Sequence, residues 1–315
     1  MTNIDDGFPF QLVGIPDACM PGDSRLHLAA AQPPLSRGAV PVKGASLPYV
    51  IEGTGQACLV LGSSIYYPRA FSKDLRQHLR LAFVDLRHFA PSDPSIAPQE
   101  ITLETYANDI EAVRTQLGLG KVIVLGHSIH GNIALEYARR YPEHVSRLIV
   151  IGSPPVGTRR MSELAEAFWN ADASEERKRV MKRNWEGMEE RVKSLPASQQ
   201  FIQTYILNGP RYWYDPTYDA AWLWRDVYAN APILDHLYGV LFKEYDLAQG
   251  PRPIATPAFL ALGRYDYAIP YTAWNDERRK LPDLSYNLFE KCGHTPQLEV
   301  SAEFDRRLIE WLRRR

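Results

Sequence analysis

The chain has 315 residues, of which 45% are hydrophobic and 23% are charged, as in ordinary globular proteins, and its formal net charge is −1. This balance excludes a strong electrostatic footprint for nucleic acid or an acidic membrane, and no segment approaches the apolar length needed to span a bilayer. The acidic N-terminus lacks the apolar stretch of a signal peptide, so we expect a soluble cytoplasmic protein, and the length suits either one large domain or a core domain with an inserted one.

Residues 1–37 are rich in Pro, Gly and Ala and lack steady periodicity, which predicts an irregular N-terminal extension. Strand-like and helical segments then alternate. Strands are expected at residues 39–43, 47–52, 57–61, 79–85 and 145–151, with one more beginning at Val122, and helices at 69–79, at 102–117 and from Ser128 to Arg140. Thr102 is the expected N-cap of its helix. Such alternation implies parallel strand pairing with helices on both faces of the sheet.

Residues 156–252 break this rhythm, because they are helical, charged and rich in Trp and Tyr. The alternation resumes with strands at 257–263 and 285–289 and helices at 272–280 and 301–314. The sequence therefore predicts a doubly wound, mostly parallel α/β sheet. Its core comprises residues 38–155 and 253–315, and residues 156–252 form an inserted helical cap.

The stretch at residues 122–138 carries the strongest chemical signal. A β-branched run ends at Gly126, Ser128 follows two residues later, and an amphipathic helical pattern begins at once. That order of strand, sharp turn and helix is what a nucleophile elbow requires. A serine held there lies at a helix N-terminus, whose free N–H groups stabilise developing negative charge. The alternative is that Ser128 is only an N-cap.

Two further polar residues follow strand ends. Asp266 comes three residues after the apolar run that ends at Gly263, and His294 follows Gly293 after the last strand. Because polar groups at the carboxyl ends of parallel strands meet at one edge, Ser128, Asp266 and His294 are expected to lie together. A histidine can take the serine proton near neutral pH, and a carboxylate fixes its tautomer. Taken singly, Asp266 fits an ordinary loop carboxylate and His294 a turn histidine.

Three segments resemble the elbow, acid and histidine motifs of the α/β-hydrolase superfamily. They are Gly-His-Ser-Ile-His-Gly at 126–131, Gly-Arg-Tyr-Asp-Tyr-Ala-Ile-Pro at 263–270 and Gly-His-Thr-Pro-Gln-Leu-Glu at 293–299. The resemblance extends from about residue 38 onward and is greatest to the capped branch with proline iminopeptidases, small-ester and lactone hydrolases and carbon–carbon bond hydrolases. It implies catalytic Ser128, Asp266 and His294 beneath a helical cap.

Three departures from the family pattern stand out. Leu61-Gly62-Ser63-Ser64 replaces the usual His-Gly, although the retained Gly keeps an oxyanion hole from the N–H groups of Ser63 and Ile129 plausible. His130 replaces a small residue after the nucleophile, and we expect it to pack or bind substrate rather than act as the base. The loop at 85–93 lacks two of the usual glycines, and its His88 is expected in a solvated loop.

The aromatic loop at 210–216 is too turn-rich for a helix interior, so Trp213 and Tyr214 are expected either to form a substrate-binding wall or to be core of the cap. No metal or organic cofactor is implied. The three cysteines, Cys19, Cys58 and Cys292, are scattered and fit neither a metal site nor a disulfide framework, and no phosphate-cradling glycine loop is present.

We therefore expect a serine hydrolase that cleaves an ester, lactone or amide of a small, largely apolar substrate through an acyl-enzyme on Ser128. A serine nucleophile argues against the alkyl-enzyme chemistry of dehalogenases and epoxide hydrolases. The alternatives are a lyase, carbon–carbon bond hydrolase or acyltransferase that uses the same triad, and a ligand-binding protein of this fold with little turnover. The sequence does not identify the substrate or the oligomeric state.

Overall fold

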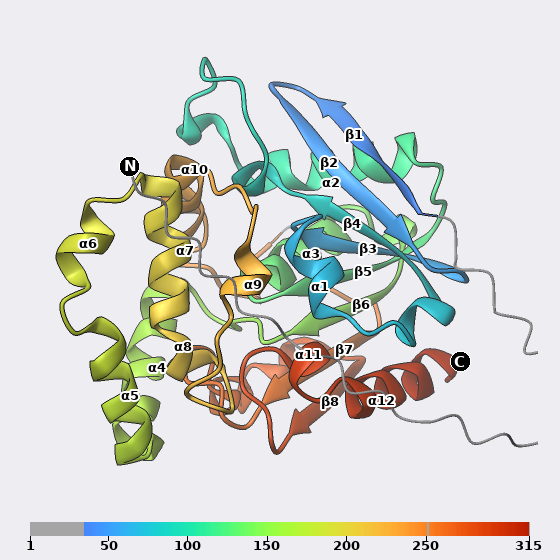
Figure 1. The fold of residues 1–315 in the computed structure, drawn as a ribbon. Coiled ribbons are helices and arrows are strands. Elements are labelled where there is room, and N and C mark those ends of the chain that lie inside the picture. The colour runs from blue at the N-terminus through green and yellow to red at the C-terminus, as the bar shows by residue number, and fades with distance from the viewer. Residues whose placement is uncertain (1–34, 251, 315) are drawn as a thin grey trace, which may run out of the picture. The chain divides into compact units, whose positions relative to one another are not determined.

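Eight strands form one mixed sheet in the computed structural model, which describes residues 35–250 and 252–314 (Figure 1). The strands are β1 (Ser36–Val42), β2 (Ala45–Glu52), β3 (Gln56–Gly62), β4 (Leu79–Asp85), β5 (Val122–His127), β6 (Val145–Ile151), β7 (Ala258–Gly263) and β8 (Leu284–Phe289).

Their order across the sheet is β1-β2-β4-β3-β5-β6-β7-β8. β2 pairs antiparallel with β1 and β4, and all other neighbours are parallel. The expected mostly parallel α/β sheet is confirmed. β1 already begins at Ser36, within the segment expected to be irregular, and the rest of that predicted extension, residues 1–34, lies outside the described residues.

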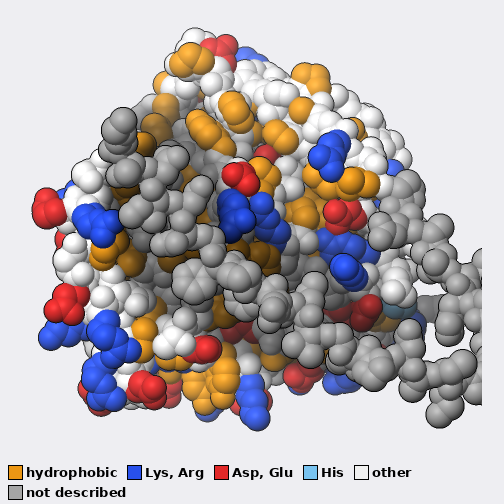
Figure 2. Space-filling view, in the orientation of Figure 1, with side chains coloured by type: hydrophobic (Ala, Val, Ile, Leu, Met, Phe, Trp, Pro, Cys, Tyr) orange, Lys and Arg blue, Asp and Glu red, His pale blue; other side chains and the backbone are white. Residues whose placement is uncertain are grey.

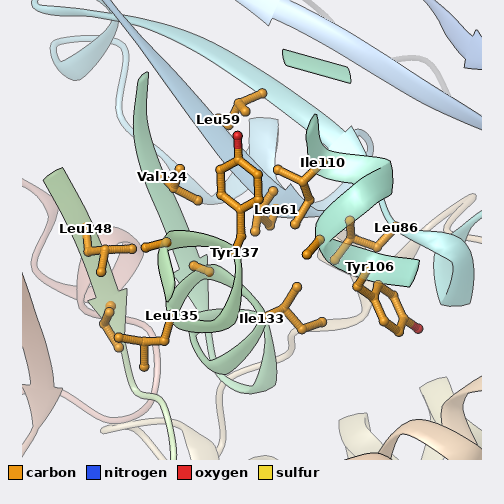
Figure 3. Packing of buried hydrophobic residues seen from close by; sticks show 14 of the residues in the cluster. Leu59, Leu61, Leu86, Tyr106, Ile110, Val124, Ile133, Leu135, Tyr137 and Leu148 are labelled. Atoms are coloured by element: carbon orange, nitrogen blue, oxygen red, sulfur yellow. The ribbon is translucent and has the colours of Figure 1, made fainter. Parts of the chain in front are cut away.

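The sheet separates two hydrophobic clusters, because successive side chains of a strand point to opposite faces. In β3, Leu59 and Leu61 belong to the cluster that includes α2 (Leu103–Gln116) and α3 (Ile129–Arg140). Cys58 and Val60 belong instead to the cluster that includes α1 (Tyr66–Ala70) and α12 (Ser301–Arg313). Figure 3 shows the first cluster, with side chains of α3 packed against those of the strands.

Among the described residues between β6 and β7 there are seven α-helices, which gather at one side of the sheet (Figure 1), and a π-helical turn at Leu237–Leu241 follows the last of them. They are α4 (Thr158–Asp172), α5 (Glu175–Trp185), α6 (Glu189–Lys193), α7 (Ala197–Leu207), α8 (Gly209–Tyr212), α9 (Ala221–Trp224) and α10 (Ala231–His236). After β8 the chain adds α11 (Pro296–Glu299) before α12. We call the α4–α10 segment the cap.

On the face drawn in Figure 2, basic and acidic side chains are interspersed. None of the described helices contains a stretch long and apolar enough to cross a lipid bilayer.

Two helices expected from the sequence are much shorter in the structure. In place of a helix at 69–79, α1 ends at Ala70, Phe71 is extended, and a single 3-10 turn follows at Leu75–Gln77. The hydroxyl of Ser72 accepts a 3.0 Å hydrogen bond from the Leu75 amide, which favours this turn over a continued helix. In place of a helix at 272–280 there are 3-10 turns at Tyr271–Trp274 and Arg278–Lys280.

The expected helix over 102–117 is confirmed, because α2 spans Leu103–Gln116 and Thr102 is its N-cap. The Thr102 hydroxyl accepts a hydrogen bond of 3.1 Å from the Thr105 amide, which satisfies one of the free N–H groups of the first turn.

Candidate active site

Ser128 lies on the tight turn between β5 and α3, with φ 57° and ψ −134°. Only one other non-glycine among the described residues, Asp226, has a positive φ. The close approach of α3 to β5 leaves no room for a side chain at Gly126, where a Cβ would collide with the His130 carbonyl. A non-glycine backbone in this region is strained and persists where the surrounding structure holds it, as at many active sites.

His294 follows β8, and its Nδ1 lies 2.6 Å from Oδ2 of Asp266, on the loop after β7. The other carboxylate oxygen of Asp266 accepts hydrogen bonds from the amides of Ala268 at 3.0 Å and Ile269 at 2.8 Å. Both side chains are almost fully buried, at 1% and 0% exposed for His294 and Asp266. The carboxylate is thus fixed by its loop and in turn orients the imidazole.

Ser128 and His294 line the same cavity, which has a volume of about 500 Å³ and lies between the sheet edge and the cap. The Nε2 atom of His294 is buried and has no hydrogen-bond partner among the described residues. A nitrogen held in this way can receive a proton from a hydroxyl positioned in front of it. Ser128 and His294, the predicted nucleophile and base, therefore line the same cavity.

Three other buried histidines lie near Ser128, and both ring nitrogens of each are hydrogen-bonded. His127 Nε2 donates to the His294 carbonyl at 2.9 Å, and its Nδ1 lies 3.3 Å from the Tyr67 hydroxyl. His130 Nδ1 donates to the His127 carbonyl at 3.0 Å, and its Nε2 lies 2.8 Å from Nε2 of His88. His88 Nδ1 in turn lies 3.0 Å from the Tyr106 hydroxyl.

These contacts fix one consistent set of tautomers, because a carbonyl oxygen only accepts. His130 carries its proton on Nδ1, so its Nε2 accepts from His88, and His88 Nδ1 accepts from Tyr106. Burial lowers the pKa of His88 and His127 well below the ordinary value and that of His130 to about 3. All three rings are therefore neutral at physiological pH, and no nitrogen of His130 is free for Ser128.

The structure corrects the expectation that His88 lies in a solvated loop, since its side chain is fully buried. The loop is held down by Arg87, whose guanidinium binds Asp109 at 2.5 and 2.9 Å and the Lys43 carbonyl at 2.8 Å. This buried ion pair ties the loop, which lacks two of the usual glycines, to α2. The sequence gives little indication of this ion pair, because Asp109 lies on α2, 22 residues after Arg87.

The loop that carries Ser63 connects β3 to α1 opposite the elbow. The Ser63 hydroxyl accepts hydrogen bonds from the amides of Ile65 at 3.2 Å and Tyr66 at 3.1 Å, and the Ser64 amide donates to Asp85. Burial raises the pKa of Asp85 to about 6. Among the described residues, the amides of Ser63 and Ile129 donate to no other group, which leaves them available to a ligand.

Gly62, just before this loop, explains how His130 is accommodated. Its φ is +132°, and a Cβ there would lie 2.5 Å from the Tyr67 ring and 2.9 Å from the His130 ring. The imidazole thus occupies space that a glycine on the neighbouring strand leaves open.

The cap wall differs from the expected one. The aromatic side chains that line the large cavity with Ser128 are Phe201 and Tyr205 of α7, Tyr212 of α8, and Tyr238 just after the cap. Trp213 is only 1% exposed and packs in the core beside Tyr218, with ring centroids 4.6 Å apart. Tyr214 is 41% exposed and packs against Tyr265, so neither lines this cavity.

A signal for this wall was present in the sequence, because Phe201 and Tyr205 are four residues apart in a helical pattern and so share one face of α7. What the pattern could not show is which face of α7 turns toward the core.

Trp213→Ala is therefore expected to lower the free energy of unfolding by about 3–5 kcal/mol, the usual cost of emptying a buried aromatic site. The kinetic constants of the folded fraction should change little. Urea denaturation and steady-state assays would measure both effects. Phe201→Ala is the matched comparison and should change kcat/KM instead. If Trp213→Ala changed kcat/KM and left the free energy of unfolding unchanged, Trp213 would be a substrate-binding residue rather than part of the core.

His130→Gln is expected to reduce the loss of folding stability that accompanies a fall in pH. Because the pKa of His130 is about 3 in the folded state and near 6.5 when unfolded, the unfolded chain binds the extra proton as the pH falls. Its contribution is present above about pH 6.5 and is lost below it, by about 2 kcal/mol at pH 5. Chemical denaturation at pH 7 and pH 5 tests this expectation. The free energy of unfolding should fall between these pH values by about 2 kcal/mol less in the variant than in the wild type. Equal losses would mean that His130 is already charged in the folded protein.

The chain is similar in sequence and in fold to known proteins. A family model described as "alpha/beta hydrolase fold" matches residues 55–300. The AB hydrolase superfamily protein YclE of Bacillus subtilis (strain 168) is 36% identical over 270 residues, covering 85% of this chain and 96% of the relative. A proline iminopeptidase of Lactobacillus helveticus (strain DPC 4571) is 23% identical over 235 residues, covering 70% and 75%.

Among solved structures, an alpha/beta fold family hydrolase from Bacillus anthracis str. Sterne superposes with a TM-score of 0.66 at 18% identity. The match covers 88% of this chain and 99% of that one. At this level of identity the likeness concerns the fold, and the chemistry must be argued from the side chains described above.

Proposed function

The chain belongs to the α/β-hydrolase fold family, and from that premise we propose that it is a serine hydrolase acting on an ester, lactone or amide of a small, largely apolar substrate. One observation carries the proposal. Among the described residues, His294 is the one of the buried His88, His127, His130 and His294 that has a ring nitrogen without a partner, and its other nitrogen is held by Asp266.

In the proposed mechanism, Oγ of Ser128 attacks the substrate carbonyl while Nε2 of His294 takes the hydroxyl proton. Asp266 keeps the other proton of His294 on Nδ1 and stabilises the imidazolium that forms. The N–H groups of Ser63 and Ile129 bind the oxyanion. His294 then gives its proton to the leaving group, and water releases the acyl group from Ser128 by the reverse sequence.

The nature of the cavity supports a largely apolar substrate. Its walls include Met161, Phe201, Tyr205 and Ile269, so most of the contact with a ligand would be apolar. Arg211 and Glu166 form the charged part of the lining and are paired with each other at 2.7 Å.

Labelling with a fluorophosphonate, followed by peptide mapping, would test the proposal, together with turnover of a panel of aryl esters, lactones and prolyl amides. We expect the label on Ser128 and measurable hydrolysis of at least one class. Labelling without any turnover would favour a lyase, carbon–carbon bond hydrolase or acyltransferase with the same residues. Absence of both would favour a ligand-binding protein.

A further inference from the structure

We propose that the enzyme is selective for short acyl groups, of about two to four carbons, carried on a much larger leaving group. This inference rests on the proposed serine hydrolase function and adds the substrate class. It follows from an asymmetry around Ser128, which lies between two cavities of very different size.

The two cavities share the nucleophile and part of the cap. Ser128, Phe201, Tyr205 and Tyr238 line both. The first cavity has a volume of about 40 Å³, and the second has about 500 Å³. A substrate bound with its carbonyl carbon at Ser128 can therefore extend in two directions.

The catalytic groups determine which part of the substrate takes which direction. His294 lines the large cavity and is absent from the lining of the small one, whereas Ser63 lines only the small one. When the acyl-enzyme forms, the bond from Ser128 Oγ to the acyl carbon is made and the bond to the leaving oxygen is broken. That oxygen takes its proton from His294. The leaving group must then lie on the His294 side, in the large cavity, and the acyl chain in the small one.

The small cavity sets the limit on the acyl chain. A water-sized group needs roughly 10–15 Å³ of such volume, so about 40 Å³ holds roughly three, which corresponds to an acetyl to butyryl chain beyond the carbonyl carbon. The walls of the small cavity have little room to move aside for a longer chain, because they are aromatic rings packed against one another. The Trp224 ring centroid lies 4.8 Å from that of Tyr66 and 6.2 Å from that of Phe89.

The large cavity, by contrast, accommodates a leaving group of drug-like size. It extends from Ser128 past Met161 and Ala165 of α4 to the ion pair between Arg211 and Glu166. The exposed fractions of these two side chains are 25% and 55%, so that end of the cavity is in reach of solvent.

The wild-type protein is tested with 4-nitrophenyl acetate, butyrate, hexanoate and octanoate, which share one leaving group. We expect kcat/KM to be similar for acetate and butyrate and to fall by roughly tenfold to a hundredfold for octanoate, as overfilling a packed site does. A matched series of acetates with ethyl, benzyl and naphthyl leaving groups should show no such loss with size. A preference for octanoate, or no dependence on acyl length, would overturn the inference.

Phe89→Ala should relieve the restriction, because Phe89 lines only the small cavity. The ratio of octanoate to acetate kcat/KM should rise by about tenfold or more. The control is Met161→Ala, which enlarges only the large cavity and should leave that ratio unchanged. If Phe89→Ala does not fold, Trp224→Leu tests the same wall from the cap side. An unchanged ratio in the folded variant, or an equal rise in the control, would contradict the assignment.

Methyl and octyl fluorophosphonates separate this inference from the proposed function. Hydrolysis of esters with faster Ser128 labelling by the octyl reagent would overturn the acyl selectivity alone. If no ester is hydrolysed and neither reagent labels Ser128, both the function and the selectivity are wrong. Faster labelling by the methyl reagent supports the small cavity even for an ester series that turns over slowly.

Discussion

Ser128→Ala should reduce turnover by several orders of magnitude. The hydroxyl on the turn between β5 and α3 is the proposed nucleophile, and without it only binding and oxyanion stabilisation remain, which supply a residual of about 10³–10⁴-fold over water. A φ of 57° is equally unfavourable for alanine and for serine, so the substitution adds no backbone strain and the fold should be retained. Steady-state hydrolysis of the best ester of the panel gives the measurement.

Two controls make this result interpretable. Circular dichroism and urea denaturation of Ser128→Ala should match the wild type, and fluorophosphonate labelling should be absent. Near-native activity in a folded Ser128→Ala protein would rule out the acyl-enzyme mechanism.

Loss of His294 should be nearly as damaging as loss of Ser128. His294→Ala removes the ring proposed to accept the hydroxyl proton, and the double variant with Ser128→Ala should be scarcely worse, because groups that act as a unit are strongly non-additive. Asp266→Asn is expected to cost about 10⁴-fold, since an amide in place of the 2.6 Å carboxylate contact favours the wrong tautomer of His294. The measurement is kcat for the three single variants and the double variant.

His130 is the matched control for His294, because both are buried imidazoles near Ser128. The pH–rate profile of His130→Gly should keep the limb that reports the catalytic base, because the His130 ring is neutral and fully hydrogen-bonded. A limb that vanished in His130→Gly and survived in His294→Ala would require the two histidines to exchange roles.

Much of the site follows from local sequence, because it depends on strand ends. Gly126 and Gly263 lie in the last residues of β5 and β7, Gly293 follows the end of β8, and the parallel order of these strands brings the three turns to one edge of the sheet. The hydrogen bond between His294 and Asp266 spans 28 residues, yet it follows from the order of two strands. The catalytic roles of these residues remain predictions.

The differences from the sequence predictions arise partly from contacts between distant segments and partly from a local hydrogen bond. His88 looked like a loop residue because nothing nearby in the chain indicates that His130 and Tyr106 bind both of its nitrogens. For Trp213 the sequence left a binding wall and the core of the cap as alternatives, and the structure buries Trp213 while Tyr212 lines the cavity. In place of the helix expected at 69–79, α1 ends at Ala70, and the Ser72 hydroxyl accepts a hydrogen bond from the Leu75 amide, which favours a separate turn.

The backbone at Ser128 also bears on attempts to stabilise the protein. A positive φ is unfavourable for most residues other than glycine, so the proposed nucleophile, Ser128, occupies one of the few described non-glycine positions where glycine would suit the backbone better. Selection for thermal tolerance alone would therefore favour discarding the serine. Stability and catalysis make opposite demands on this residue, and directed evolution of a more robust catalyst needs an activity screen in every round.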